Sequence, residues 1–571
     1  MERFWTKHYD AGVPPSVPFE ERTLVGYLDR AAAEWPGRPA LTLKGRTLTY
    51  RQLQDLVDRF ATALARLGVG KDSRVALWLP NLPPMVIGFF ATLRLGAQVV
   101  NTNPLYVERE LEHQFNDAGV TVVVTLDYLW MSRLRAIRAR TPVQHVVVTK
   151  IPDYLPFPLS LLAPLKLRKT GQIAKVPREE GVHVFKELVA ENPPRPPKVE
   201  FGLDHVAVLQ YTGGTTGISK GAMLTHRNIS FNAQQCNSWF PFPMVEPGRE
   251  VFLACLPYFH VFGMTASLGW PVVCGAQIVL APNPRDIPDL VKSIVRYRVT
   301  QFPAVPALFG AINNHPGVEK LDVTSIKGCF SGSAPLPVEV LERFERLTGA
   351  RITEGFGMTE TSPVTHGNPL SGLRKPGTVG IPIPDTEQRV VDLETGSREL
   401  PIGEDGELCI RGPQVMAGYW NRPEETAHTL VDGWVHTGDL AHIDEDGYCT
   451  IVGRKKDMIV VSGFNVYPDE VDGVLFAHPA VLEAATIGLP DERKGETVKS
   501  FVVLRPGAAA TEQEVIDHCR RELAAYKVPR SIEFVPELPK SSMMKILRRE
   551  LREREIARMK QREKEPSATV A

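Results

Sequence analysis

Residues 211–224, YTGGTTGISKGAML, combine glycine, threonine and lysine in a pattern suited to holding phosphate. Exposed backbone N–H groups, hydroxyl groups and one ammonium group can all donate to an anion. A strand-like stretch precedes the loop and an apolar-periodic stretch follows it, which predicts a strand, a loop and then a helix. The candidate phosphate ligands are Thr212, Gly213, Gly214, Thr215, Thr216, Gly217 and Lys220.

The loop lacks the spacing of a Walker P-loop. That motif places glycine directly before its lysine and serine or threonine directly after it. Here Ser219 precedes Lys220 and Gly221 follows it. The spacing argues against a P-loop kinase or ATPase, and a plain structural turn stays open.

A second candidate phosphate site is EGFGMTET, residues 354–361. Gly355 and Gly357 flank Phe356 and leave its ring free to stack on a flat base. Thr359 could bond a phosphate oxygen, and Glu360 could hold a magnesium ion that bridges phosphates. Just upstream, the small-residue loop CFSGSAPLP could also approach a ring. Each stretch alone could be a simple turn after a strand, but together with the first loop they favour a nucleotide site.

Two further stretches carry charged residues at positions that need an explanation. In the first, 436–468, Asp439 could accept from the two hydroxyls of a ribose and Arg454 could contact the same sugar. Lys455, Lys456 and Asp457 interrupt two strand-like runs and form either an exposed turn or a hinge. In the second, 538–551, Lys545 precedes a charged helical run whose residues mostly form a solvated face.

The elements around these loops predict an α/β fold. Buried strands are expected at 73–80, 120–127, 144–150, 205–212 and 275–282. An amphipathic helix is expected at 53–68, with Gly68 as its stop. This alternation indicates a large multi-subdomain N-terminal domain with mixed or parallel sheets. After residue 453, three short strands and a helix from Thr511, capped with Glu514, indicate a small α+β C-terminal domain.

Composition excludes several classes of protein. Lys plus Arg and Asp plus Glu number 66 each, so a nucleic-acid partner is not expected. Seven scattered cysteines without a CxxC pair predict neither a disulfide framework nor a zinc cluster, and they suit the cytoplasm. The charged start MERFWTKHYDAG is unlike a secretory signal, and no apolar run reaches the roughly 20 residues that span a bilayer.

Residues 154–169, YLPFPLSLLAPLKLRK, qualify that picture. Mostly apolar residues are followed by Lys166, Arg168 and Lys169, and three prolines argue against a regular helix. Two interpretations stay open: a buried insertion loop, or a shallow contact with the inner face of the membrane in which the cations meet anionic headgroups.

From about residue 25 to residue 555, these stretches resemble the acyl-adenylate-forming enzymes, in the order that family has them. YTGGTTGISKG is similar to the family's phosphate loop, YFHVFG (258–263) to its aromatic–histidine motif, and SGSAP and EGFGMTET to its adenine and magnesium segments. HTGD, GRKKD and the lysine before ILRR resemble its ribose, hinge and catalytic-lysine segments. Within the family, residues 282–292, 412–426, 432–456 and 455–471 most resemble bacterial long-chain fatty-acid–CoA ligases.

The resemblance implies a fatty acid activated by ATP and Mg²⁺ and then transferred to coenzyme A. It implies residues 1–453 as the N-terminal domain, 454–457 as the hinge and 458–560 as the mobile domain. The composition of the chain end predicts 561–571 as a disordered tail. It assigns catalytic roles to Lys220, His260, Glu360 and Lys545, with Thr216 and Glu360 at the metal. The remaining implied contacts are to nucleotide or pantetheine, from Ser333, Ala334, Gly355, Phe356, Gly357, Met358, Thr359, Asp439, Arg454, Lys456, Gly463 and Phe464.

The chain departs from the family pattern at two positions. Ser219 replaces the usual proline before the loop lysine, and we expect little effect. Met544 replaces the glycine before the catalytic lysine, where a positive φ would strain methionine.

Several alternatives follow from the sequence. The enzyme could activate another acid or load a carrier protein, or the chain could be an adenylation-dead protein that traps fatty acids. A homodimer and the preferred acyl chain length are left open.

Overall fold

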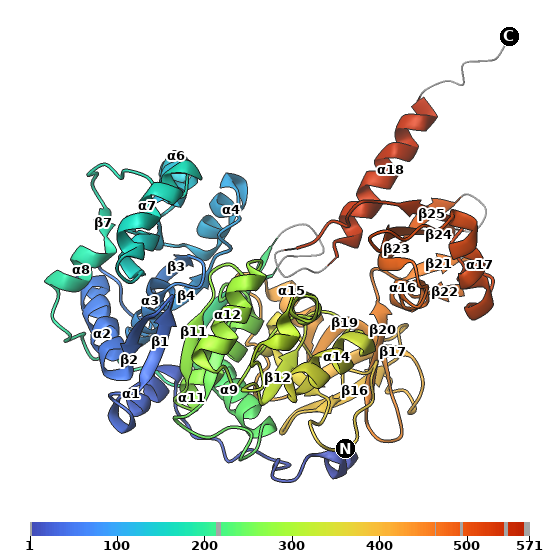
Figure 1. The fold of residues 1–571 in the computed structure, drawn as a ribbon, viewed down its shortest axis with the longest axis horizontal. Helices are drawn as coiled ribbons and strands as arrows, with labels where there is room; N and C mark the ends of the chain where they lie inside the picture. The colour runs from blue at the N-terminus through green and yellow to red at the C-terminus, as the bar shows by residue number, and fades with distance from the viewer. Residues whose placement is uncertain (1–2, 213–218, 463, 492–494, 542–545, 565–571) are drawn as a thin grey trace. The chain divides into compact units, whose positions relative to one another are not determined.

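The structure is a computed structural model, and it describes residues 3–212, 219–462, 464–491, 495–541 and 546–564. The chain divides into two compact units, residues 1–387 with 410–435 and residues 388–409 with 436–571. Figure 1 shows the elements of both units. The domain boundary predicted at residue 453 stays a prediction.

The largest sheet of the first unit has seven strands in the order β7-β6-β5-β3-β4-β8-β9. Its pairs are parallel, except that β8 and β9 are antiparallel. Valine-rich segments buried on both faces form its centre, as parallel strands require. The strands are β3 (Arg74–Trp78), β4 (Gln98–Asn101), β5 (Val122–Leu126), β6 (His145–Thr149), β7 (Val182–Val184), β8 (Val206–Thr212) and β9 (Lys220–Thr225).

Two four-stranded sheets also lie in the first unit, and the predicted strand at 275–282 is β11. The first has the order β10-β11-β1-β2, from β1 (Pro39–Leu43), β2 (Arg46–Thr49), β10 (Val251–Ala254) and β11 (Gln277–Leu280). The second has the order β12-β13-β14-β15, from β12 (Gly328–Ser331), β13 (Arg351–Gly357), β14 (Val364–Gly367) and β15 (Ile381–Pro382). The predicted α/β class with mixed sheets is confirmed.

The helix predicted at 53–68 is α2 (Tyr50–Arg66), which begins earlier because Thr49 and Gln52 form a capping box. Leu53, Val57 and Phe60 lie on its buried face, as the pattern predicts. The other helices of this unit with seven or more residues are α1 (Leu24–Glu34), α3 (Pro83–Arg94), α4 (Glu108–Ala118), α7 (Leu159–Lys169), α8 (Phe185–Glu191), α9 (His226–Trp239), α12 (Ile287–Tyr297), α13 (Pro306–Asn313), α14 (Val338–Thr348) and α15 (Pro423–Thr429).

Short helical segments connect these elements. They are η1 (Phe4–His8), α5 (Asp127–Leu129), η2 (Trp130–Leu134), α6 (Arg135–Ile137), η3 (Arg138–Arg140), η4 (Ile151–Tyr154), α10 (Val261–Met264), η5 (Thr265–Gly269), α11 (Trp270–Val273), η6 (Val318–Lys320) and η7 (Thr359–Thr361).

The prediction that prolines prevent a regular helix at 154–169 is wrong, since α7 forms there with Pro164 inside it. Pro156 and Pro158 precede the helix and do not interrupt it. None of its residues is buried, so the interpretation as a buried loop is wrong as well.

The remaining strands belong to two sheets. One sheet has the order β16-β17-β19-β18, with β20 paired to β19; the other has the order β22-β21-β24-β23, with β25 paired to β24. The strands are β16 (Glu387–Val391), β17 (Gly406–Arg411), β18 (Leu430–Val431), β19 (Trp434–Ile443), β20 (Cys449–Arg454), β21 (Ile459–Val461), β22 (Phe464–Val466), β23 (Val481–Asp491), β24 (Gly495–Leu504) and β25 (Ser531–Phe534).

Three helices accompany the second sheet: α16 (Pro468–Phe476), α17 (Glu512–Glu522) and α18 (Arg548–Lys564). The predicted capping box of Thr511 and Glu514 begins α17 and is confirmed. Because α18 runs to Lys564, residues 561–564 of the predicted tail are helical, while 565–571 lie outside the described residues.

All seven cysteines are free and buried. Within the described part of the chain, no helix is long and apolar enough to cross a membrane.

Candidate active site

The phosphate-loop candidate is the connection of a β-hairpin. Thr212 pairs with Lys220 in the register of β8 and β9, and the Ser219 hydroxyl donates to the Thr212 carbonyl at 2.6 Å. The expected loop-to-helix order is wrong, because β9 intervenes before α9 begins at His226. Gly213, Gly214, Thr215, Thr216 and Gly217 lie outside the described residues.

A segment that the sequence did not assign to the site runs alongside β9. Ala222 bridges Tyr419 in antiparallel fashion, and the Trp420 amide donates to the Gly221 carbonyl at 2.8 Å. This pairing brings the Tyr419 ring within 5.6 Å of the Lys220 ammonium. Lys220 also lies 3.5 Å from the Glu425 carboxylate on α15.

Glu360 is tied to the same segment. Its carboxylate accepts from the Tyr419 hydroxyl at 2.5 Å, and its carbonyl accepts from the Met416 amide. Burial, followed by the neighbouring Glu360 charge, raises the pKa of Tyr419 well above its usual range, so the phenol keeps its proton and donates. The first unit thus brings Lys220 and Glu360 to one place through Tyr419, which a search for known phosphate motifs alone does not identify.

Phe356 lies near the end of β13, between two glycines that have no room for a side chain. A Cβ on Gly355 would lie 2.5 Å from the His366 carbonyl oxygen, and one on Gly357 would lie 2.1 Å from the Pro363 carbonyl oxygen. Strand β13 therefore packs backbone to backbone on the β14 region. The Phe356 ring is half-buried and meets the His366 ring edge-on, with centroids 6.0 Å apart.

The loop after β12 carries Ser333 and Ala334 beside this strand. Ser333 has a φ of +74°, a conformation that costs a non-glycine residue about 1 kcal/mol or more and that clusters at functional sites. Ala334 is exposed and Ser333 is half-buried. Met358 and Thr359, which follow β13, are also half-buried.

Glu354 fastens this loop to β13. Its side chain accepts from the Leu336 amide at 2.8 Å and is only 6% exposed. Burial raises the pKa of Glu354 to about 7, although the hydrogen bond from Leu336 opposes the shift.

His260 lies at the N-terminus of α10, where its Nδ1 accepts from the Phe262 amide at 3.2 Å. The preceding residue is linked to the phosphate hairpin, because the Gln210 side chain on β8 donates to the Phe259 carbonyl at 2.7 Å. Asn101 on β4 donates in turn to Gln210 at 2.9 Å. Buried amides therefore couple the aromatic–histidine motif to the hairpin.

The same motif also meets the adenine candidates. A Cβ on Gly332 would lie 3.3 Å from the Phe262 ring, and the Thr265 hydroxyl donates to the Ser362 carbonyl at 2.5 Å. The first unit thus brings together the ends of the phosphate hairpin, the aromatic–histidine motif, the loop of Ser333 and the segment from Phe356 to Glu360.

The second unit brings together Asp439 and Arg454. They are opposite one another in the register of β19 and β20, and the Arg454 Nε lies 2.9 Å from the Asp439 carboxylate. Asp439 is 4% exposed and Arg454 is half-buried. The next residue, Lys455, pairs with Glu407 at 3.3 Å, whereas Lys456 is exposed. Phe464 is exposed on β22 and stacks on the Tyr526 ring, and Gly463 lies outside the described residues.

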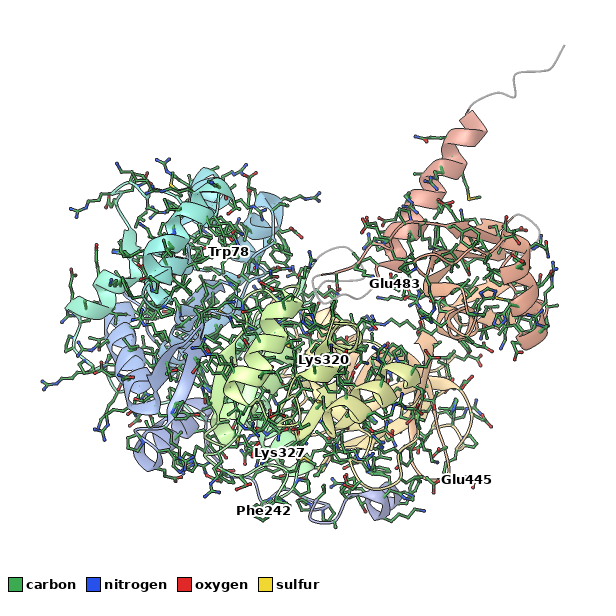
Figure 2. All side chains as sticks on the ribbon, viewed as in Figure 1. Trp78, Phe242, Lys320, Lys327, Glu445 and Glu483 are labelled. Carbon is green, nitrogen blue, oxygen red and sulfur yellow. The ribbon has the colours of Figure 1, made fainter. Side chains whose placement is uncertain are left out.

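The two residues that raised the question of strain, Met544 and Lys545, lie outside the described residues, but both ends of their segment are fastened within the second unit. Lys540 and Ile546 form an antiparallel bridge, and Lys540 pairs with Glu483 (labelled in Figure 2). The Leu547 amide donates to the Pro539 carbonyl at 2.9 Å.

Arg548 then attaches the start of α18 to α16. It contacts Asp469 and lies 2.7 Å from the Asp472 carboxylate, which is 4% exposed. Burial opposes the charge of Arg548, but Asp472 and Asp469 outweigh it and hold the pKa of the guanidinium above its usual range. Ion pairs and hydrogen bonds therefore hold the described residues that precede and follow 542–545.

Comparison with known proteins places the chain in a family. The model of the AMP-binding enzymes matches residues 28–420, and that of the AMP-binding enzyme C-terminal domain matches residues 470–545. The chain belongs to the AMP-binding enzyme family.

Individual relatives cover nearly the whole chain. The long-chain-fatty-acid–CoA ligase of Bacillus subtilis is 42% identical over 554 residues, covering 96% of this chain and 98% of its own. The crystal structure of the anthranilate CoA ligase AuaEII with anthranoyl-AMP matches with a TM-score of 0.83 at 29% identity, covering 94% of this chain and 98% of its own. ATP-bound MatB from Rhodopseudomonas palustris matches with a TM-score of 0.81 at 29% identity, covering 93% and 99%.

Replacing Glu354 by glutamine tests the electrostatics of the loop after β12. Because folding raises the carboxyl pKa from 4.5 to about 7, its contribution to stability is fully present below pH 4.5 and is lost as the pH rises through 7. The free energy of unfolding of the glutamine variant, relative to that of the wild type, should therefore increase by about 3 kcal/mol between pH 4 and pH 8. Urea unfolding followed by tryptophan fluorescence measures this, since all eight tryptophans lie in the first unit. If the difference in free energy of unfolding between the two proteins stayed constant across this pH range, the assigned burial of Glu354 would be wrong.

Replacing Arg548 by methionine tests the anchor beside residues 541–545. The change leaves Asp472 buried without its cation and should destabilise α16 and α18 by about 3–5 kcal/mol. Hydrogen exchange of the amides in these helices measures the loss. Arg549→Met, which removes an exposed cation paired with Glu553, is the matched control and should change stability by less than about 0.5 kcal/mol.

A second replacement, Asp472→Asn, should restore part of the stability in the Arg548→Met background, because it removes the uncompensated buried charge. Additive losses in the double variant would show that the ion pair does not hold the helices together.

Proposed function

We propose that this enzyme is an AMP-forming long-chain fatty-acid–CoA ligase that uses ATP, Mg²⁺ and coenzyme A. The observation that carries the proposal is the 42% identity to a ligase of that name along almost the entire chain. The convergence of Lys220, Glu360 and Phe356 with the aromatic–histidine motif supports it, because these groups suit the parts of ATP and an acid in one site.

In the first half-reaction, the fatty carboxylate attacks the α-phosphorus of ATP, and pyrophosphate leaves as acyl-AMP forms. Such a transfer needs mainly positioning and neutralisation of charge. In our proposal Lys220, Thr212 and the residues 213–217 hold the β- and γ-phosphates. Phe356, with Gly355, Gly357 and Met358 around it, frames adenine together with Ser333 and Ala334.

Glu360 and Thr216 are the proposed ligands of Mg²⁺, and Thr359 bonds a phosphate oxygen. A buried carboxylate is an oxygen ligand of the type that Mg²⁺ prefers, and a magnesium ion at phosphates commonly has only one or two carboxylates. When bound, the ion supplies positive charge to the phosphate oxygens. Tyr419 orients the Glu360 carboxylate by donating to it, and we assign it a positioning role.

The second unit supplies the remaining groups. We propose that Asp439 accepts from the ribose hydroxyls while Arg454 holds its carboxylate in place. Lys545 stabilises the charge that accumulates where the carboxylate meets the α-phosphate. His260 lies beside the reacting carboxylate.

In the second half-reaction, the thiol of coenzyme A attacks the carbonyl of acyl-AMP, AMP leaves and the thioester forms. We propose that residues 458–560 rotate about the hinge 454–457 near Lys456 between the two steps. The rotation withdraws Lys545 and brings Gly463 and Phe464 to the pantetheine arm. The proposal further places the enzyme in the cytoplasm, in contact with the inner face of the membrane, and allows a homodimer.

An assay across acids is the direct test of the substrate. ATP, coenzyme A and acids of increasing chain length are incubated with and without Mg²⁺, and AMP and thioester are measured. We expect Mg²⁺-dependent formation of both, highest with long-chain acids. Preference for an aryl or medium-chain acid would contradict the substrate, and acyl-AMP formation that leaves free coenzyme A unused would identify a carrier-loading enzyme. Fatty-acid binding without ATP turnover would identify a trapping protein.

Lys545→Ala separates the two half-reactions. The change should abolish acyl-AMP formation from ATP, because the charge at the α-phosphate is no longer neutralised, yet largely spare thioester formation from supplied acyl-AMP. Lys560→Ala, an exposed lysine of α18, is the control and should leave both steps unchanged. Equal losses in both half-reactions for the Lys545 variant would refute the assigned role.

A further inference from the structure

Helix α7 and the residue pair before it form an exposed apolar surface at the margin of the first unit. Phe157 is 80% exposed and Leu161 is 67% exposed, and the helix buries none of its residues. Figure 1 shows α7 on the outer side of the unit, near α6 and α8. We call this the α7 surface, and its residues are Phe157, Leu159, Leu161, Leu162, Leu165, Lys166, Arg168 and Lys169.

The α7 surface is strongly basic although the whole chain has no net charge. Residues 154–178 contain no aspartate or glutamate and have five cations, Lys166, Arg168, Lys169, Lys175 and Arg178. In the described parts of the chain, no carboxylate lies within 4.0 Å of any of these five cations. The charge is therefore available to an external anionic partner.

Apolar and basic residues are separated along the helix axis rather than around it. Four of the five leucines occupy positions 159–165, and the cations follow at 166–169 with Leu167 between them. Eleven residues extend about 16 Å, which is half the thickness of a bilayer core, so the helix cannot span one. An axial separation suits oblique entry, with leucines among acyl chains and cations at the headgroups.

We propose that the α7 surface binds the anionic lipid bilayer directly. A second copy of the chain fits this surface less well, because a two-fold contact would bring the cations of one copy against either the cations or the leucines of the other. An anionic bilayer satisfies both halves of the surface at once. This proposal deepens the proposed function, since a long-chain acid partitions into membranes and the contact would place the enzyme at its substrate.

The test is co-sedimentation of the full-length protein with large vesicles of phosphatidylcholine containing 25% phosphatidylglycerol, compared with pure phosphatidylcholine. Each cation near an anionic surface contributes about fivefold to partitioning at low salt. The variant Lys166→Gln/Arg168→Gln/Lys169→Gln should therefore bind the anionic vesicles about a hundredfold more weakly. Leu161→Ser/Leu162→Ser/Leu165→Ser should bind weakly to both kinds of vesicle, and 0.5 M NaCl should weaken wild-type binding.

Matched controls lie elsewhere on the first unit. Phe242 is 76% exposed, Lys320 is exposed, and both are labelled in Figure 2. Phe242→Ser removes one large exposed apolar side chain, and Lys71→Gln/Lys292→Gln/Lys320→Gln removes three exposed cations, as many as the α7 charge variant does. Both control variants should bind vesicles as the wild type does. Circular dichroism and the unfolding midpoint verify that every variant is folded.

Equal partitioning of the wild type and the two α7 variants would overturn the proposal. A second outcome would also overturn it: the wild type is a dimer in sedimentation velocity, the leucine variant is a monomer, and the two bind vesicles equally. The occupant of the α7 surface would then be a second copy of the chain. The proposed function can fail independently of the α7 surface. If the α7 variants lose vesicle binding but the wild type has no ligase activity, the membrane surface is supported and the ligase activity is rejected.

Discussion

Close backbone contact around β13 is the constraint on which the first-unit site depends. The carbonyl oxygens of His366 and Pro363 occupy the space that side chains on Gly355 and Gly357 would need. Only glycine permits this approach, and real Cβ atoms do not come so near to backbone. Because the strand is held so tightly, Phe356 between the glycines and Glu360 beyond them have fixed starting positions. The hydrogen bond from the Leu336 amide to Glu354 attaches the loop after β12 to the same strand.

Tyr419 contacts both charged groups of the candidate site. Glu360 is buried and accepts from the Tyr419 phenol, whose raised pKa keeps its proton in place. Lys220 contacts the same ring and pairs with Glu425, so one aromatic side chain contacts both the Lys220 cation and the Glu360 carboxylate. This arrangement suits the proposed polyphosphate and metal ion, because the lysine and the Glu360 carboxylate would then bind different partners.

Much of the fold could be predicted from the sequence, because the central strands are valine-rich and the helix caps are local signals. The capping boxes at Thr49 and Thr511 depend on residues three positions apart, so sequence alone indicates them. The β8–β9 hairpin is not predicted because AMLT continues into a helical pattern, and only its antiparallel pairing with β8 distinguishes a strand there. The exposure of α7 could not be predicted either, since an apolar run gives the same pattern whether it is covered or not.

The residues of the candidate site also fall into two groups, those that the sequence predicts and those that it does not. Lys220, Phe356 and Glu360 were found because each lies in a compact motif, and Asp439 and Arg454 because a turn and a strand end place them. Tyr419 was not found, although its stretch was noted as similar to the family, because its role depends on pairing with β9 across almost 200 residues. Gln210 and Asn101 are buried amides on strands, where most such residues simply satisfy local hydrogen bonds. A sequence motif therefore indicates which residues can meet a ligand, whereas the residues that orient them emerge only when strands distant in the chain are paired.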